Sequence, residues 1–238
     1  MTDGLPRRLA VISAGTSEPS STRMLADRIA QTSLDLLREL GAPATVSIVA
    51  LAPLAVDIAR ATVTGILSGE LQEAVERLAT ADAVIASTPV YKAGISGLFK
   101  SFVDVLDDDL LIAKPVLLGA TAGSSRHALV ADEQMRPLFA YIRALTLPTS
   151  VFAAREDWGS SELSDRIRRA ATELAVLVSS QVEQQIADRA WSGYQHQFAG
   201  NAGRAEHTAA DVDFASPLMR LAAGGKSAPR KTGLERQP

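Results

Sequence analysis

The sequence predicts an α/β fold, in which helices cover both faces of a mostly parallel β-sheet. Short apolar runs alternate with segments whose apolar residues recur every three or four positions, as in successive strand and helix units. One run, Ala83–Ser87, barely alternates between apolar and polar residues, which indicates a strand buried on both faces. The length of 238 residues fits one such domain with appended elements, or two small domains.

The first half of the chain contains three predicted strands with helices between them. Each strand is a short apolar or β-branched run, and each helix has apolar residues on one face, as Leu25, Ile29 and Leu36 illustrate. Gly41 and Pro43 end the first helix. In order, the elements are a strand at Leu9–Ser13, a helix at Ser20–Leu40, a strand at Thr45–Leu51, a helix beginning near Gly69 and a strand at Ala83–Ser87.

The second half continues the alternation with two more strands. Its predicted elements are a helix at Ile95–Leu106, a strand at Pro115–Ala120, a helix at Met135–Ile142, a strand at Pro148–Ala153 and a helix at Leu163–Val178. The connections are long enough for right-handed crossovers between parallel strands. Five strands with helices between them predict a three-layer sandwich of flavodoxin type with a five-stranded parallel sheet, plus a C-terminal extension.

The helical and strand patterns end near Ala187, so we expect one domain over residues 7–187. Residues 188–222 form an extension with one short amphipathic stretch around Leu218, which packs either across a subunit boundary or back on its own domain. Residues 223–238 are polar and rich in Gly and Pro, and we expect them to be disordered.

Composition excludes several classes of function. The net charge is −3, and no cluster of five or more basic residues offers a nucleic-acid surface. The absence of cysteine excludes disulfides, Cys-ligated metal centres and thiolate catalysis. No apolar run approaches the roughly 20 residues of a membrane helix, and the N-terminal apolar run is too short for a secretory signal. We therefore expect a soluble cytoplasmic protein.

The loop after the first predicted strand is rich in hydroxyl groups. It precedes a helix N-terminus, where free backbone N–H groups and the helix dipole favour a phosphate. Helix capping by Ser20 or Ser21 is the alternative, although a cap needs only one hydroxyl. Neither a nucleoside triphosphate loop nor a dinucleotide fingerprint is present. The candidate phosphate-binding residues are Gly15, Thr16, Ser17, Ser20, Ser21 and Thr22.

Two further loops follow the third and fourth predicted strands, and small residues in both allow backbone groups to approach a flat ligand. Ligands of open α/β sheets bind at the carboxyl ends of the strands, so all three loops belong to one edge. Together they predict a site for a planar ring on a phosphorylated chain. The candidate ring-binding residues are Pro89, Val90, Tyr91, Lys92, Ala93 and Gly94, and then Thr121, Ala122, Gly123 and Ser124.

The motifs of these loops resemble those of a known family. The resemblance covers residues 9–153 and is to the NADPH-dependent FMN reductases, in the branch that feeds reduced flavin to two-component, luciferase-like or sulfonate monooxygenases. The matching segments are Pro89-Val90-Tyr91-Lys92-Ala93 with Ser96-Gly97-Leu98-Phe99-Lys100, and Ala120-Thr121-Ala122-Gly123-Ser124 with His127-Ala128-Leu129 and Met135-Arg136-Pro137.

The resemblance implies bound FMN, hydride transfer from NAD(P)H, and a homodimer or homotetramer with the flavin near a subunit interface. The chain departs from the family pattern at two places. Gly15-Thr16-Ser17-Glu18 stands where Gly-Ser-x-Arg is common, and Gly94-Ile95-Ser96 stands where some alkanesulfonate-linked reductases carry an inserted Tyr. A carboxylate repels a phosphate. We therefore expect Glu18 to point outward, or the phosphate to contact the later hydroxyls of the loop instead.

The sequence predicts no catalytic side chain and no metal ligand, because the flavin ring itself carries hydride chemistry. We expect His127 to act as a hydrogen-bonding residue at a helix end, and Asp107–Asp109 to form a solvated helix terminus. Two alternatives remain: a quinone, azo or chromate reductase that retains FMN, and a non-catalytic flavodoxin-like electron carrier. The low aromatic content of 5% and the mild charge count against the electron carrier.

Overall fold

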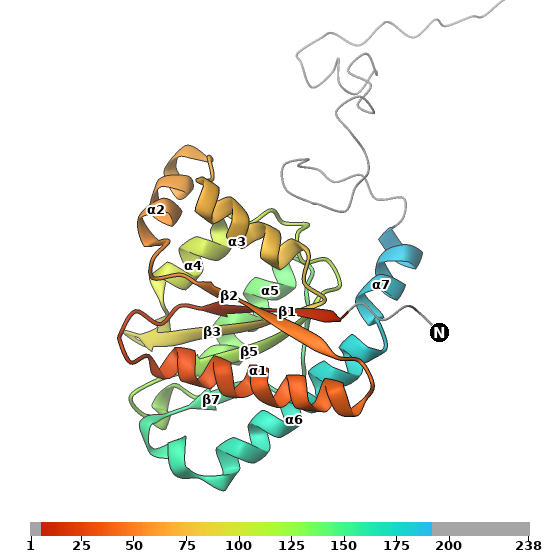
Figure 1. Ribbon diagram of the computed structural model, residues 1–238. Helices are drawn as coiled ribbons and strands as arrows, with labels where there is room; N and C mark the ends of the chain where they lie inside the picture. The colour runs from red at the N-terminus through yellow and green to blue at the C-terminus, as the bar shows by residue number, and fades with distance from the viewer. Residues whose placement is uncertain (1–5, 192–238) are drawn as a thin grey trace, which may run out of the picture. The chain divides into compact units, whose positions relative to one another are not determined.

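The structure is a computed structural model that describes residues 6–191. A sheet of mostly parallel strands lies between two layers of helices (Figure 1). Its strands follow the spatial order β2-β1-β3-β5-β6, while β7 also pairs with β5 and the short β4 pairs antiparallel with β3. The strands are β1 (Arg7–Ser13), β2 (Ala44–Ala50), β3 (Ala83–Tyr91), β4 (Gly94–Ile95), β5 (Pro115–Thr121), β6 (Leu145–Thr146) and β7 (Val151–Ala153).

Two hydrophobic clusters lie between the sheet and its two layers of helices. Helices α1 and α6 cover one face of the sheet, and α2, α3, α4 and α5 cover the other (Figure 1). The helices are α1 (Ser21–Glu39), α2 (Ala55–Thr64), α3 (Gly69–Ala79), α4 (Gly97–Asp104), α5 (Arg136–Tyr141), α6 (Ser161–Ser179) and α7 (Val182–Ile186). Short 3₁₀ turns lie at Ser125–His127 and Arg155–Gly159, and π-helical turns at Ala131–Met135 and Ala187–Trp191.

Serine side chains cap the N-termini of four of the helices that flank the sheet. Ser20, Ser68, Ser96 and Ser160 each accept a hydrogen bond from the backbone N–H three residues later, at the starts of α1, α3, α4 and α6. Such a cap satisfies one of the N–H groups that a helix leaves without a partner at its N-terminus. The local sequence therefore fixes where these helices start.

The predicted flavodoxin-like sandwich is confirmed, with several differences in its elements. The helix predicted from Ile95 begins at Gly97, because Ile95 belongs to β4, and α7 was not predicted. Strand β3 continues to Tyr91 instead of ending at Ser87. The strand predicted at Pro148–Ala153 is replaced by two shorter ones, β6 and β7, which pair with opposite ends of β5. Helix α2 was not predicted at all, because its only buried residues are Ile58 and Ala61 and these form no clear stripe in the sequence.

The end of the described chain reaches Trp191, four residues beyond the predicted domain boundary at Ala187. The rest of the predicted extension, residues 192–222, and the predicted tail at 223–238 lie outside the described residues. Glu183 on α7 is buried and lies 3.7 Å from the buried ammonium of Lys114. No helix among residues 6–191 is both long enough and apolar enough to cross a membrane.

Candidate functional site

Hydrogen bonds join the three predicted loops at the carboxyl edge of the sheet. The Ala14 N–H, just after β1, donates to the Ser87 carbonyl of β3 at 3.0 Å. The hydroxyls of Thr16 and Tyr91 lie 3.2 Å apart, which connects the first loop to the second. The predicted convergence of the loops is therefore confirmed. Which of their residues bind a ligand stays a prediction.

The third loop, which follows β5 and which we call loop three, is joined to the start of α1 by a buried contact. The hydroxyls of Thr22 and Thr121 lie 2.7 Å apart, and both residues are almost fully buried. The Ser87 hydroxyl adds a bond to the Thr22 carbonyl at 3.1 Å. The side chains of Thr22 and Thr121 thus face each other, so a ligand at this edge would meet their backbone rather than their hydroxyls.

The first loop folds tightly onto the start of α1. A Cβ on Gly15 would come within 1.9 Å of the Ser20 hydroxyl oxygen, so glycine allows the hydroxyl to keep its present position. That hydroxyl accepts a hydrogen bond from the Arg23 N–H at 3.2 Å, which makes Ser20 the predicted helix cap. Ser17 donates to the Pro19 carbonyl at 3.1 Å, while Ser21 is exposed. Capping therefore occupies only one hydroxyl of this loop.

Backbone donors of the first loop are open. From Thr16 to Thr22, no backbone N–H donates to an acceptor within residues 6–191. They lie at the N-terminus of a 19-residue helix, where the dipole adds positive potential. Glu18 is exposed and makes no ion pair with the described part of the chain. This loop can accept an anion.

The second loop is a β-hairpin, whereas the sequence analysis treated it as an irregular connection. Pro89, Val90 and Tyr91 belong to β3, and Gly94 belongs to β4. Only Lys92 and Ala93 form the turn, with φ of 50° and 66°. Left-handed backbone costs roughly 1–2 kcal/mol for a residue that carries a Cβ. The backbone that was predicted to approach a ligand is therefore that of a hairpin, and the residues of its turn do not favour the conformation they adopt.

Contacts with residues outside the hairpin hold it in place. The Gln134 side chain bonds both the Ala93 carbonyl and the Ile95 N–H. The buried Thr88 hydroxyl accepts from the Ser96 N–H at 3.2 Å, which ties β3 to the start of α4. The sequence analysis missed both Gln134 and Thr88, because a hydroxyl inside an apolar strand and a glutamine on a helix carry no distinctive pattern.

Loop three leaves β5 with small side chains. The Ala122 N–H donates to the Ala153 carbonyl of β7 at 3.1 Å, and the Ser125 N–H donates to Glu156 Oε1 at 3.2 Å. Gly123 is exposed, and a Cβ there would meet nothing within 4 Å. His127 is the last residue of the 3₁₀ turn Ser125–His127; its role as a hydrogen-bonding residue stays a prediction. The loop offers an open backbone surface beside the first two.

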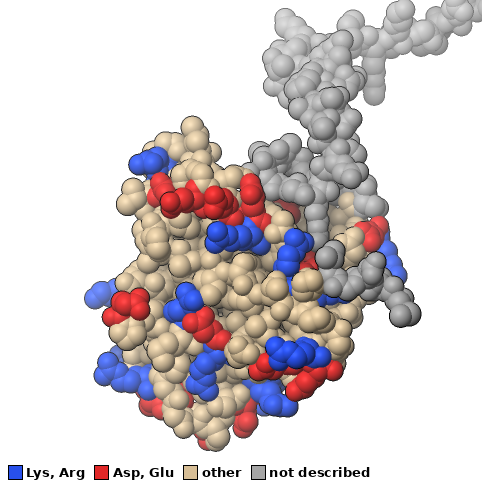
Figure 2. All heavy atoms as spheres, viewed as in Figure 1, with Lys and Arg blue, Asp and Glu red and all other residues tan. Residues whose placement is uncertain are grey.

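Charged side chains outside the three loops form contacts within the fold. Asp109 is buried and forms an ion pair with Arg143, so the expectation that Asp107–Asp109 is a solvated terminus is wrong for this residue. Asp107 accepts from the Asp109 N–H at 2.9 Å. Basic and acidic side chains intermingle on the face shown in Figure 2, without a broad basic area. Among residues 6–191, no group of three or more His, Asp or Glu could hold a metal ion.

Comparisons with known proteins place this geometry in a family. The family described as NADPH-dependent FMN reductase matches residues 7–159. The NADH-dependent FMN reductase SfnE of Pseudomonas putida is 39% identical over 181 residues, which cover 70% of this chain and 89% of that protein. The FMN reductase (NADPH) of Pseudomonas aeruginosa is 35% identical over 185 residues, which cover 75% of this chain and 96% of that protein.

A solved structure agrees with these relatives. An oxidoreductase from Corynebacterium diphtheriae superposes with a TM-score of 0.71 at 45% sequence identity, covering 74% of this chain and 98% of the other. The family match spans more than half of the chain and includes all three loops. The chain therefore belongs to the NADPH-dependent FMN reductases, oxidoreductases that use FMN and a reduced nicotinamide.

Proposed function

We propose that the three loops bind FMN and that the chain supplies reduced FMN to a partner monooxygenase. The observation that carries the proposal is the run of open backbone N–H groups between Thr16 and Thr22, beside a Gly15 whose missing Cβ leaves room for the Ser20 hydroxyl. These donors and the α1 dipole bind the phosphate of FMN. The hairpin turn and loop three meet the edge of the flavin ring.

Bound FMN supplies the hydride acceptor, and NAD(P)H supplies the hydride. The chain's own task is to orient the two rings and to limit water around them. Its loops do this without an acid or base, since the residues that meet the ring are chiefly small ones such as Ala93, Gly94, Ala122 and Gly123. Tyr91, about half exposed on the hairpin, lies where it can cover the ring region.

Release of the reduced flavin fits an open site. The hairpin turn and Gly123 are exposed, and the described loops contain no aromatic cage around them. The relatives carry names that describe FMN as the compound reduced. We extend this to a flavin-dependent monooxygenase as the acceptor, on the resemblance of the loop motifs to the reductases of two-component systems. A homodimer or homotetramer in the cytoplasm remains our expectation.

Anaerobic kinetics with the full chain test the proposal. Purified protein is mixed with NADH or NADPH and free FMN, and the loss of flavin absorbance is followed. We expect catalysed bleaching, saturation by free FMN, a sequential kinetic pattern, and loss of flavin on dialysis. Ping-pong kinetics with flavin retained through dialysis would instead indicate the FMN-retaining quinone, azo or chromate reductase. Bleaching no faster than without protein would remove the reductase assignment.

A further inference from the structure

The turn between β3 and β4 has a conformation that its own residues do not favour. Tyr91 pairs with Gly94 across the hairpin, so Lys92 and Ala93 occupy the two central turn positions, both at positive φ. Two-residue hairpin turns of this kind favour Asn, Asp or Gly, because a Cβ disfavours left-handed backbone. Strained backbone of this kind persists where the surrounding structure fixes it. The support must come from outside the turn.

Gln134 provides that support with a single amide group. Its Oε1 accepts a hydrogen bond from the Ile95 N–H at 3.0 Å, and its Nε2 donates to the Ala93 carbonyl at 3.2 Å. A Cβ on Gly94 would lie 3.2 Å from the same Oε1, so glycine lets the amide come close. The side chain thus bonds backbone on both sides of Gly94 and defines the position of the turn.

Gln134 stands on a π-helical turn, Ala131–Met135, in which the Arg136 N–H donates to the Ala131 carbonyl five residues earlier. Pro137 follows directly and has no N–H for the carbonyl of Glu133, which interrupts the regular α-helical ladder at this point. π-helical turns are rare and widen the helix locally. The proline in the sequence thus accompanies the irregular turn that carries Gln134.

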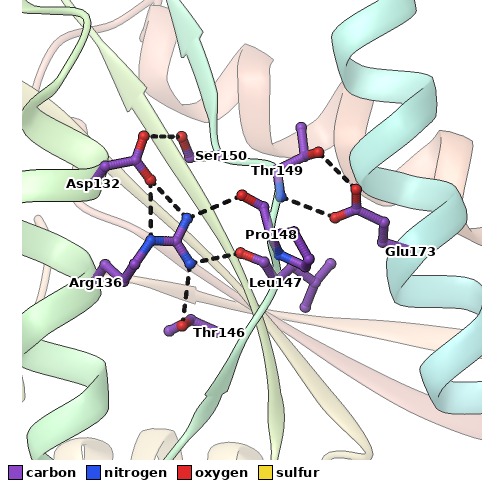
Figure 3. A network of polar contacts seen from close by, with 8 residues as sticks. All are labelled: Asp132, Arg136, Thr146, Leu147, Pro148, Thr149, Ser150 and Glu173. Carbon is purple, nitrogen blue, oxygen red and sulfur yellow. Dashed lines mark hydrogen bonds and ion pairs between the residues drawn. The ribbon is translucent and has the colours of Figure 1, made fainter.

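Asp132 and Arg136 bind the π-helical turn to the segment between β6 and β7. Arg136 donates to the carbonyls of Leu147 at 2.7 Å and Pro148 at 3.2 Å, and Asp132 accepts from the Ser150 hydroxyl at 2.9 Å. Figure 3 shows both side chains pointing at the segment between β6 and β7, whose far side is held by Glu173 of α6. Gln134 therefore extends from an anchored element to the hairpin, and its amide acts on the turn from a fixed position.

We propose that Gln134 is a positioning residue for FMN, which holds the Lys92–Ala93 turn in the conformation that the flavin ring meets. This rests on the proposed function, in which the hairpin contacts the ring. The same hairpin carries Tyr91, whose hydroxyl lies 3.2 Å from that of Thr16 in the phosphate loop. A displaced turn would therefore disturb both the ring contacts and the first loop. Gln134 itself acts through the backbone of the hairpin.

Two variants separate the two hydrogen bonds. Gln134→Ala removes both, and we expect the Kd for FMN, measured by quenching of flavin fluorescence, to rise roughly five- to tenfold. Gln134→Glu keeps the acceptor for the Ile95 N–H but places a carboxylate oxygen against the Ala93 carbonyl oxygen. Because the two oxygens repel each other, the Kd of this variant for FMN should rise as well. We expect KM for FMN to follow the Kd while kcat at saturating FMN stays near the wild-type value.

Hydrogen exchange provides a readout that a general loss of stability would not reproduce. In Gln134→Ala, the Ile95 amide should exchange faster while amides of the central strands, such as that of Ile85, keep their wild-type rates. The matched control is Gln72→Ala, which removes a partly exposed glutamine of α3 whose side chain bonds only Glu76. This control should leave both the FMN affinity and the exchange of Ile95 unchanged.

The outcomes distinguish this inference from the proposed function. If wild-type protein binds FMN and Gln134→Ala binds it equally well, the positioning role is overturned while the FMN site stands. If the wild type takes up no FMN, the proposed function fails and this inference fails with it. Equal weakening in Gln134→Ala and Gln72→Ala would also overturn it, because the effect would then not depend on the hairpin contact.

Discussion

The two edges of the sheet differ in how their polar groups are used. At the amino edge, the Lys114 ammonium donates to three carbonyls, those of Leu78, Ala79 and Ala81, at 2.7–2.9 Å. Asp82 accepts from the Arg8 N–H at 2.7 Å. At the carboxyl edge, by contrast, a run of backbone N–H groups between residues 16 and 22 has no acceptor in the described part of the chain.

This difference separates stability from binding. Among residues 6–191, no buried side-chain nitrogen or oxygen lacks a hydrogen-bond partner. The donors left open at the carboxyl edge are backbone groups of a loop whose residues 16–19 are exposed. Polar groups that are satisfied within the chain stabilise the fold, while groups left open can bind a ligand. Substitutions at the amino edge should therefore change the free energy of unfolding, and substitutions at the carboxyl edge should change the affinity for FMN.

The largest expected effect is that of Lys114→Met. The substitution keeps most of the apolar stem but removes the donor of three carbonyls and leaves the buried Glu183 without the nearby ammonium. Breaking a buried charge contact of this kind costs about 3–5 kcal/mol of unfolding free energy. Urea denaturation monitored by circular dichroism measures it. The folded fraction should bind FMN with wild-type affinity; a large change in affinity without loss of stability would contradict the division between the edges.

Arg136→Met tests the segment between β6 and β7, two strands that pair with opposite ends of β5. The guanidinium bonds Asp132, Thr146 and two carbonyls but remains partly exposed. We therefore expect a smaller loss, about 1–2 kcal/mol of unfolding free energy. FMN affinity should fall less than in Gln134→Ala, since Gln134 itself is retained. The control is Arg38→Met on α1, an exposed pair with Asp35 that should change stability by less than about 0.5 kcal/mol.

Gly15→Ala places a methyl group where the Ser20 hydroxyl lies in the carboxyl-edge loop. Because the Cβ would approach Ser20 Oγ to 1.9 Å and Ser20 Cβ to 3.0 Å, the Ser20 side chain must leave its cap position or the loop must shift, and either change alters the arrangement of the donors. We expect the Kd for FMN, measured by calorimetry, to rise about tenfold, which corresponds to about 1.4 kcal/mol. Gly69→Ala at the start of α3 is the matched control, because a Cβ there meets nothing within 4 Å. Equal binding by both variants would remove Gly15 from the site.

The sequence predicted the meeting of the three loops because parallel strands bring their carboxyl ends to one edge, whatever the detailed contacts. It predicted α1 well, since Ser20 caps it and Leu25 and Ile29 are buried on one face. It missed α2, whose large apolar residues Val56 and Val63 are exposed and therefore break the expected pattern. Local patterns thus predicted the elements that bury a regular stripe of side chains.

Details of the site depended on contacts between distant residues. The bond from Gln134 to the Ala93 carbonyl joins positions 41 apart in the sequence, and no periodicity predicts it. The positive φ of Lys92 and Ala93 also contradicts local preference, so the turn was treated as an irregular loop. Pro148 has no N–H for a strand ladder, and its carbonyl is bound by Arg136 instead, which explains why the predicted Pro148–Ala153 strand is shorter.

The smallest expected effect compares two identical helix caps. Ser20 and Ser68 both accept from the N–H three residues later, at 3.2 Å and 3.3 Å, so each serine-to-alanine change should cost about 1 kcal/mol of unfolding free energy. Only Ser20 lies beside the open donors of the first loop. Ser20→Ala should therefore also weaken FMN binding, by about two- to fivefold in a fluorescence titration, while Ser68→Ala leaves it unchanged. Weakening by both variants would show that affinity follows global stability rather than the chemistry of this edge.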